Sequence, residues 1–426
     1  MGKLESTVPG LEYPSGRDLY LKSGHGFLEG RKIDDGAEGL WRIRNGLYDL
    51  ENWLHKHPGG AEWLTLTKGT DITEAFECHH LTDRAENLLP KFYIRDAKQP
   101  RKIPFTFMPN GFYQTFKKRA LLALKNVNFH HPARSTNLIA DFLVSSAIFF
   151  SLMATKFWLA IIPAALFLTW SCVIGHNYLH MRDTFRMFYM DLSFFSTREW
   201  RITHVLSHHL YPNTIWDVEV YALEPFFQWL PNKKKSFLKK SLSVLITPGV
   251  YALALFGQTI KRYYLVFRVW KQFDIRDIIP FSLPLLMSIV APNFSTAVKT
   301  WIIIIFFTSL FFHFIGFNAA HHHPDIFHDG DIARKDQDWG LLELDAVRGR
   351  EIVDDSLFLA LTNFGSHTLH HLLPTVDHAY LPLCLDAYYE TCKEFRLKPD
   401  DKMTYWQHVK GQFQQLTRIE SKYNSR

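Results

Sequence analysis

The sequence contains little cysteine, with only four such residues among 426. Their spacing matches neither a disulfide framework nor a zinc knuckle, so we expect neither of these, and a reducing compartment is the simpler inference. The four are Cys78, Cys172, Cys384 and Cys392.

The first residues also lack the apolar core of a cleavable signal peptide. Gly2 and Ser6 fit the loose pattern for N-myristoylation, although an ordinary flexible N-terminus is the simpler interpretation. No internal repeat is apparent apart from three histidine-rich motifs.

The net charge is modest, at +6, and the basic residues cluster beside apolar runs. This distribution favours an anionic membrane surface over nucleic acid as a partner. Hydrophobic residues make up 47% of the chain, with 36 Phe and 12 Trp, yet the mean hydropathy is near zero. We therefore expect a polar soluble module joined to a body with a few membrane spans and a large aqueous face.

Three histidine motifs stand beside apolar runs, and each has histidines three or four positions apart. On a helix such residues share one face, as a metal site requires. A single pair of this kind is more often a surface or core feature, but three together favour a shared metal site. The motifs contain His176 and His180; His204, His208 and His209; and His367, His370 and His371.

A compact domain begins near residue 38. Asn45-Gly46 predicts a two-residue hairpin turn, and Pro58-Gly59-Gly60 ends a short helix so that His57 sits on a tight loop. His80, with His79 beside it, lies in a second loop. Two such histidines can hold a haem by both axial positions, which leaves no open site for oxygen, so this haem would only carry electrons.

Five apolar runs follow, at about 138–154, 157–174, 241–258, 277–293 and 300–317. If all five crossed a membrane, the third histidine motif would face away from the second. The run 241–258 has basic residues at both ends and is interrupted by Pro248, so we interpret it as interfacial or re-entrant. The prediction is four transmembrane helices, with both termini and all histidine motifs on the cytoplasmic side.

Two further segments allow a structural interpretation, one before the first apolar run and one after the last. Residues 112–122 read as a basic amphipathic helix at the membrane surface, with a solvated helix packed on the main domain as the alternative. After the last span, Asn318 and His322 have the i, i+4 relation, and His321 lies between them. A histidine run at a helix end can also simply favour the helix dipole. Residues 325–365 are strongly charged and should form a cytosolic cap.

The residues 47–60 and 76–83 resemble a cytochrome b5 domain, which implies that His57 and His80 are the axial ligands of haem b. The body, over roughly 130–385, resembles the membrane fatty-acid desaturase family. This resemblance implies that the eight histidines of the three motifs bind two iron ions. It also makes His322 a ninth ligand, His321 a less favoured one, and Asn318 a residue acting through water. His367 stands where related fused desaturases usually have glutamine, so the position of the double bond cannot be transferred.

The expected function is desaturation of a long-chain acyl-CoA or lipid, with O2 as oxidant and electrons passed through the fused haem domain. NADH-cytochrome b5 reductase is the expected electron source, and the endoplasmic reticulum membrane is the expected location. Three alternatives remain: a hydroxylase of the same fold, a non-enzymatic haem electron carrier with a degenerate body, and a zinc lipid hydrolase. Chain length, head group and oligomeric state stay open.

The predicted fold is a small α+β haem domain followed by an all-α membrane body with a histidine-rich cytosolic cap. Its predicted parts are a flexible N-terminus (1–37), a cytochrome b5-like domain (38–95), a linker with a basic interfacial helix (96–136), a membrane desaturase-like domain (137–385) and a cytosolic C-terminal tail (386–426).

Overall fold

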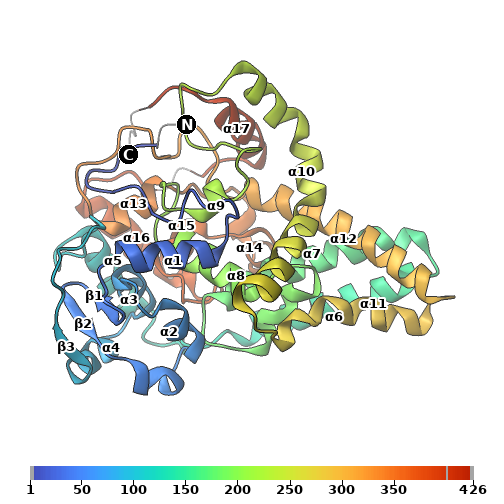
Figure 1. Ribbon diagram of the computed structural model, residues 1–426, viewed down its shortest axis with the longest axis horizontal. Coiled ribbons are helices and arrows are strands. Elements are labelled where there is room, and N and C mark those ends of the chain that lie inside the picture. The colour runs from blue at the N-terminus through green and yellow to red at the C-terminus, as the bar shows by residue number, and fades with distance from the viewer. Residues whose placement is uncertain (1–3, 400–401, 423–426) are drawn as a thin grey trace.

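A computed structural model describes residues 4–399 and 402–422. In Figure 1 the small mixed domain lies at the lower left, and long helices extend to the right. A layer of short helices and loops joins the two parts. The second and third histidine motifs lie in that layer, and the first lies at the end of the long helix Ile161–Leu179. Gly2, the candidate myristoylation site, lies outside the described residues.

The small domain contains a three-stranded antiparallel sheet in the order β1-β2-β3. Ile43 pairs with Gly46, so the hairpin turn consists of Arg44 and Asn45, one position before the predicted one. Arg44 has a φ of 55°, the left-handed conformation that such a turn needs. The elements are β1 (Trp41–Ile43), β2 (Gly46–Tyr48), α2 (Ala61–Thr67), α3 (Thr73–His79), α4 (Arg84–Leu88) and β3 (Tyr93–Asp96).

The prediction of a flexible segment over 1–37 is wrong for residues 4–37. Helix α1 (Gly24–Asp34) is capped by the Ser23 hydroxyl, and Phe27 is buried in the main core. Arg17 is also buried and donates to the carbonyl of Ile215 at 2.9 Å. The N-terminal segment thus packs across the cap of the membrane body, because its apolar residues complete that core.

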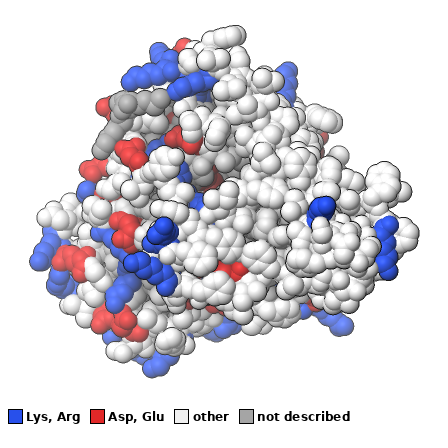
Figure 2. Space-filling model, turned by 45° about the vertical axis from the view of Figure 1, so that its right-hand side comes forward, with Lys and Arg blue, Asp and Glu red and all other residues white. Residues whose placement is uncertain are grey.

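Two helical hairpins form the long end of the body. Helices α6 (Arg134–Ala154) and α7 (Ile161–Leu179) pack side by side, as do α11 (Ile279–Val290) and α12 (Phe294–Phe317). The ends of both hairpins that carry the connecting turns lie together on the right of Figure 1. Charged side chains are sparse over this part in Figure 2 and dense over the opposite part. An apolar surface of this kind suits lipid.

Four helices of the described residues are long and apolar enough to cross a membrane, and they are not the predicted four. Helix α10 (Phe237–Tyr264) continues to Trp270 and qualifies, although the sequence suggested an interruption at Pro248. Helix α11 has 12 residues and is too short by this criterion. The other three agree with the predicted runs: they are α6, the helix Trp158–Leu179, which contains α7, and α12.

The predicted interfacial helix is α5 (Phe112–Ala123), and its apolar face is not available to a membrane. Phe112, Tyr113, Phe116 and Ala120 are buried, because α5 packs between α13 (Trp339–Asp345) and α16 (Leu385–Glu394). The alternative of a helix packed on the main domain is therefore correct.

The predicted C-terminal tail is likewise packed: α16 contacts α5, and α17 (Tyr405–Thr417) contacts α10. The remaining short helices of the cap are α8 (Thr197–Trp200), the π-helical segment η5 (Arg201–His208), α9 (Val218–Tyr221), α14 (Leu357–Asn363) and α15 (His367–Leu372).

Candidate metal centre and haem pocket

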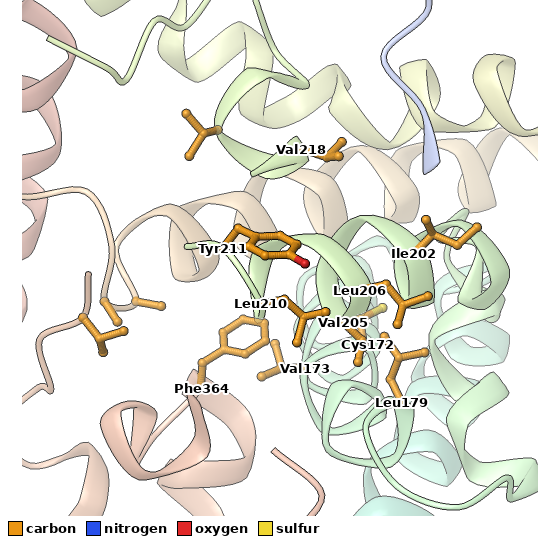
Figure 3. Packing of buried hydrophobic residues seen from close by; sticks show 14 of the residues in the cluster. Cys172, Val173, Leu179, Ile202, Val205, Leu206, Leu210, Tyr211, Val218 and Phe364 are labelled. Carbon is orange, nitrogen blue, oxygen red and sulfur yellow. The ribbon is translucent and has the colours of Figure 1, made fainter. Parts of the chain in front are cut away.

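The second histidine motif lies on η5, whose wider turn changes which residues share a face. His209 donates its backbone N–H to the carbonyl of His204 at 2.8 Å, a bond that spans five residues. Widened turns of this type are frequent at functional sites. The opposite face of η5 is apolar: Val205 and Leu206 pack against Cys172 and Leu179 of α7 (Figure 3). This packing fixes the second motif beside the first.

The three motifs converge, and they do so through one type of atom. The Nε2 of His176 lies 2.8 Å from that of His204 and 3.1 Å from those of His180 and His370. The Nε2 of His321 lies 2.8 Å from that of His367 and 3.1 Å from that of His208. Nitrogens of imidazoles from four parts of the chain therefore face one another in a buried space.

Several of these rings have their other nitrogen bonded to an acceptor. His204 Nδ1 is 3.0 Å from Glu219, His208 Nδ1 is 2.8 Å from Asp217, and His371 Nδ1 is 2.8 Å from Glu343. His321 and His367 direct Nδ1 to backbone carbonyls, at 2.9 and 3.1 Å. Carboxylates and carbonyls only accept, so each Nδ1 carries the proton and each Nε2 of a neutral ring presents a lone pair.

Facing lone pairs at such distances repel each other unless a cation lies between them. Two nitrogen ligands about 2.1 Å from one metal ion and at right angles lie roughly 3.0 Å apart, which matches the observed spacing of 2.8 to 3.1 Å. The donor sets therefore fit metal ions. Among the described residues, three groups have ligand atoms within 4.8 Å of one another: His176, His180, His209 and His370; His208, His321 and His371; and His204, His208 and Glu219.

The buried acids Asp217 and Glu343 and the half-buried Glu219 set the charge of this site. Burial lowers the pKa of His208, but Asp217 and Glu219 outweigh this effect and raise it above its usual value. Burial raises the pKa of Glu219, and the neighbouring His204 and His208 reverse this and bring it to about 2. Burial also raises the pKa of Glu343 well above its usual range, with Asp217 adding to the effect. A bound cation would favour the ionised form of this acid.

The geometry reverses the predicted order of His321 and His322. His321 joins the group with His208 and His371, whereas the ring of His322 stacks on Trp229 with centroids 3.7 Å apart. Asn318 donates to the carbonyl of Phe314 at 2.7 Å. Helix α12 ends at Phe317, so the i, i+4 relation assumed for Asn318 and His322 does not exist.

An apolar cavity of about 160 Å³ adjoins this cluster. Aromatic side chains form much of its wall, including Phe195, Trp200, Phe312 and Phe364, and His204, His208 and His367 line it as well. Lys261, paired with Glu199 at 3.1 Å, also belongs to the wall. An unbranched apolar group in this cavity would contact the histidine cluster directly.

The small domain has a larger cavity, of about 510 Å³, between His57 and His80. Their ring centroids are 6.2 Å apart, and their Nδ1 atoms bond the carbonyls of Gly60 and Phe76 at 2.9 and 3.0 Å. Each Nε2 is thereby free to bind a metal between the rings. Burial lowers the pKa of His80 to about 4, which keeps its ring neutral. The volume and the two ligands fit haem.

His79 also lines this cavity, but its ring lies against Trp63 with centroids 5.5 Å apart. The pair of His57 and His80 is therefore the better fit for two axial ligands.

Sequence reasoning missed the three acids that orient the histidines. Asp217 and Glu219 follow the second motif by 8 to 15 positions and sit in an ordinary polar stretch, and Glu343 is in the charged cap. No spacing rule links them to their partners, because the contacts arise from the fold. The acidic pair just beyond a histidine motif was the one available signal.

Comparison with known proteins finds a family match for both parts of the chain. Residues 154–401 match the fatty acid desaturase family model, and residues 29–98 match the cytochrome b5-like haem/steroid binding domain. A cytochrome b5-related protein of Drosophila melanogaster is 39% identical over 415 residues, covering 96% of this chain and 95% of that protein. An acyl-lipid (8-3)-desaturase of Mortierella alpina is 23% identical over 88% of this chain and 92% of its own.

Cytochrome b5 of Candida tropicalis is 42% identical over 62 residues, which are 14% of this chain and 48% of that protein. No solved structure matches the chain. The predicted family and the predicted haem domain are thus confirmed, and the chain belongs to the fatty acid desaturase family and carries a cytochrome b5-like domain at its N-terminal end.

Proposed function

We propose that this protein is a membrane-bound desaturase that inserts a double bond into a long-chain acyl-CoA or acyl lipid. The observation that carries the proposal is the set of facing Nε2 lone pairs, at 2.8 to 3.1 Å, in rings whose Nδ1 protons go to acceptors. Two iron ions bound there would supply the O2 chemistry that removes hydrogen from an unactivated chain. The proposed ligands are His176, His180, His204, His208, His209, His321, His367, His370 and His371.

The residues of the chain hold and orient this centre. Asp217, Glu219 and Glu343 keep the Nδ1 protons of three rings in place, so that each Nε2 stays directed inward. The aromatic wall with Phe195 and Phe312 binds the acyl chain and excludes water. The small size of the cavity beside the histidines, about 160 Å³, suits a narrow methylene chain.

The fused haem domain is the proposed electron donor. His57 and His80 would hold haem b through their Nε2 atoms, and a haem with both axial positions filled would carry electrons without binding oxygen. A reductase that uses NADH is the proposed source of these electrons. A zinc hydrolase would need no such domain, and for this reason we prefer iron.

The convergence of the motifs supports a particular topology. An even number of crossings must separate His209 from His367, yet α10, α11 and α12 lie between them. We assign α10 to the membrane interface, because Lys239 and Lys240 lie in its first turn and Lys261 near its end, and because it also packs on α17. We assign α11 as a crossing although it has only 12 residues, because the exposed apolar residues Phe273, Ile275 and Ile278 directly precede it. The proposed location is the endoplasmic reticulum, with both termini cytoplasmic.

The lipid profile of cells with and without the protein tests the function. We expect a new or enlarged pool of unsaturated acyl chains, absent when His208 is replaced by Ala. Hydroxylated chains in place of unsaturated ones would identify a hydroxylase, and an unchanged profile with intact haem would leave a haem electron carrier. A tag inserted after residue 235 should be accessible from the cytoplasm, and a lumenal tag there would contradict the topology.

A further inference from the structure

The haem cavity is not closed by its own domain. One side of its wall comes from the membrane body, namely from Phe129, Met181, Arg182, Leu206 and Thr375 together with His180. The cavity therefore exists in this form only when the two parts of the chain are docked.

His180 is the residue that joins the two sites. It lines the haem cavity, and it also belongs to the group formed with His176, His209 and His370. On the haem side, His79 lies next to the ligand His80. The hydroxyl of Thr375 donates to the backbone carbonyl of His79 at 3.5 Å. A single side chain thus separates the space for the haem from the space for the metal pair.

Ion pairs of Glu62 with Arg201 and Arg276, which we call the latch, hold the two parts in this position. Glu62 on α2 of the haem domain lies between two arginines of the body, 2.7 Å from Arg201 and 2.8 Å from Arg276. Arg201 has a fully buried side chain, lies over the Trp63 ring at 4.4 Å, and also contacts Asp183 at 2.8 Å. Because Arg201 begins η5, the helix that carries His204, His208 and His209, the latch is attached directly to the ligand helix.

The backbone around the haem ligand completes the latch. Arg182 Nε donates to the carbonyl of Pro58 at 2.9 Å, and the Asp183 N–H donates to that of Gly59 at 3.3 Å. Gly60 has a φ of 117°, and a Cβ there would overlap the carboxylate of Asp183. The second glycine of the His57-Pro58-Gly59-Gly60 loop is thus required for the close approach of the body, apart from any role in the turn.

We propose that the haem domain and the membrane body form one fixed electron-transfer unit, in which Glu62, clamped by Arg201 and Arg276, holds the haem cavity against His180. The acceptor in this unit is the metal pair of the proposed function, on which the inference rests. A haem held by His57 and His80 would give up one electron at a time, and metal ions held by the histidine cluster would accept these electrons. A nicotinamide-dependent reductase supplies the electrons. Two electrons, two protons and two substrate hydrogens convert one O2 to two waters.

Replacing Glu62 by Arg in the full-length, haem-loaded protein tests this inference. The new cation faces Arg201 and Arg276, so the parts should separate, since disrupting a buried charge pair is costly. Hydrogen exchange in peptides covering 57–62 and 180–184 should rise about tenfold, and so should the rate of haem transfer to apomyoglobin. Oxidation of the reduced haem in the presence of O2 and an acyl-CoA should slow by about the same factor.

Two further variants keep the test specific. Glu51→Gln removes an exposed ion pair with Lys68 inside the haem domain and should change none of these rates. Adding Arg276→Glu to Glu62→Arg should restore part of the lost protection, which a general folding defect would not allow. If Glu62→Arg fails to bind haem at all, Glu62→Gln gives the same comparison with a smaller effect.

The outcomes separate this inference from the proposed function. Wild-type exchange and haem-transfer rates in Glu62→Arg would overturn the latch. Faster exchange with unchanged haem oxidation would overturn the docked state as the route for electrons. A wild-type protein with a protected interface and slow haem transfer, but with no lipid product, would contradict the proposed function and leave the latch standing.

Discussion

The two histidine sites of this protein orient their rings in different ways. In the haem pocket, the Nδ1 atoms of His57 and His80 bond carbonyls only three and four residues away. In the metal cluster, the rings of His204, His208 and His371 rely on acids that lie 15, 9 and 28 positions away. The two haem ligands are thus oriented by groups close to them in the sequence, whereas the ligands of the metal site depend on the packing of the whole body.

This difference indicates which substitutions should disturb the histidine orientation in each site. A loop that orients its own histidine keeps that orientation as long as the loop folds. The cluster collects side chains from α7, η5, α15 and the segment after α12, so its geometry depends on each of these elements keeping its place. We therefore expect single changes in the cluster to act on the whole metal pair.

The largest effect should come from removing a ligand of the cluster. His208→Ala or His370→Ala should reduce lipid product below detection, because each leaves a metal ion without one of its few ligands. The haem absorption spectrum should stay unchanged in both variants, since the two sites use different ligands. Product formation by either variant would contradict its histidine as a ligand of the metal pair, and a changed haem spectrum would contradict the proposed division between the sites.

Removing an axial ligand should have an equally local effect in the other domain. His57→Ala and His80→Ala should each abolish the low-spin haem spectrum, while His79→Ala should keep it, because the His79 ring packs on Trp63. His55→Ala, an exposed neighbour, serves as the control. If His79→Ala loses the spectrum and His80→Ala keeps it, the assignment of the ligand is wrong.

The adjacent pair His321 and His322 gives a sharper test of the cluster. His321→Ala should lose bound metal and product, because its Nε2 lies 2.8 Å from that of His367. His322→Ala should retain both and show only a modest loss of thermal stability, since it removes a ring stacked on Trp229. Metal content and product are measured in parallel, and the reverse result would restore the ligand that the sequence suggested.

The smallest expected effect concerns the acids behind the ligands. Glu343→Gln keeps the shape of the side chain but removes its charge next to His371, and it should lower metal affinity or activity by about 10- to 100-fold. Glu390→Gln, on the exposed face of α16, is the matched control. Equal metal affinity in the two variants would mean that His371 needs no charged partner.

The sequence allowed prediction of whatever depends on neighbours along the chain. The histidine motifs, the loop at His57 and three of the four long apolar helices are of this kind, because helical spacing and loop residues are local properties. Prediction failed where tertiary packing decides. Helix α5 has an amphipathic face, but α13 and α16 cover it, and the apolar residues before α1 are buried in the main core instead of being free.

The geometry favours His321 where the sequence suggested His322, for a related reason. The sequence does not indicate that α12 ends at Phe317, and once the helix has ended, spacing no longer predicts which ring faces the cluster. The acids Asp217, Glu219 and Glu343 could not be assigned either, because their partners are set by how separate segments meet in space.

Metal analysis of the purified, haem-loaded protein tests the central claim most directly. Nine imidazoles around facing lone pairs should hold two metal ions, so we predict close to two iron atoms per chain in addition to the haem iron. His208→Ala should lower this number without lowering haem content. Zinc in place of iron, or a chain that holds only its haem iron, would contradict the account.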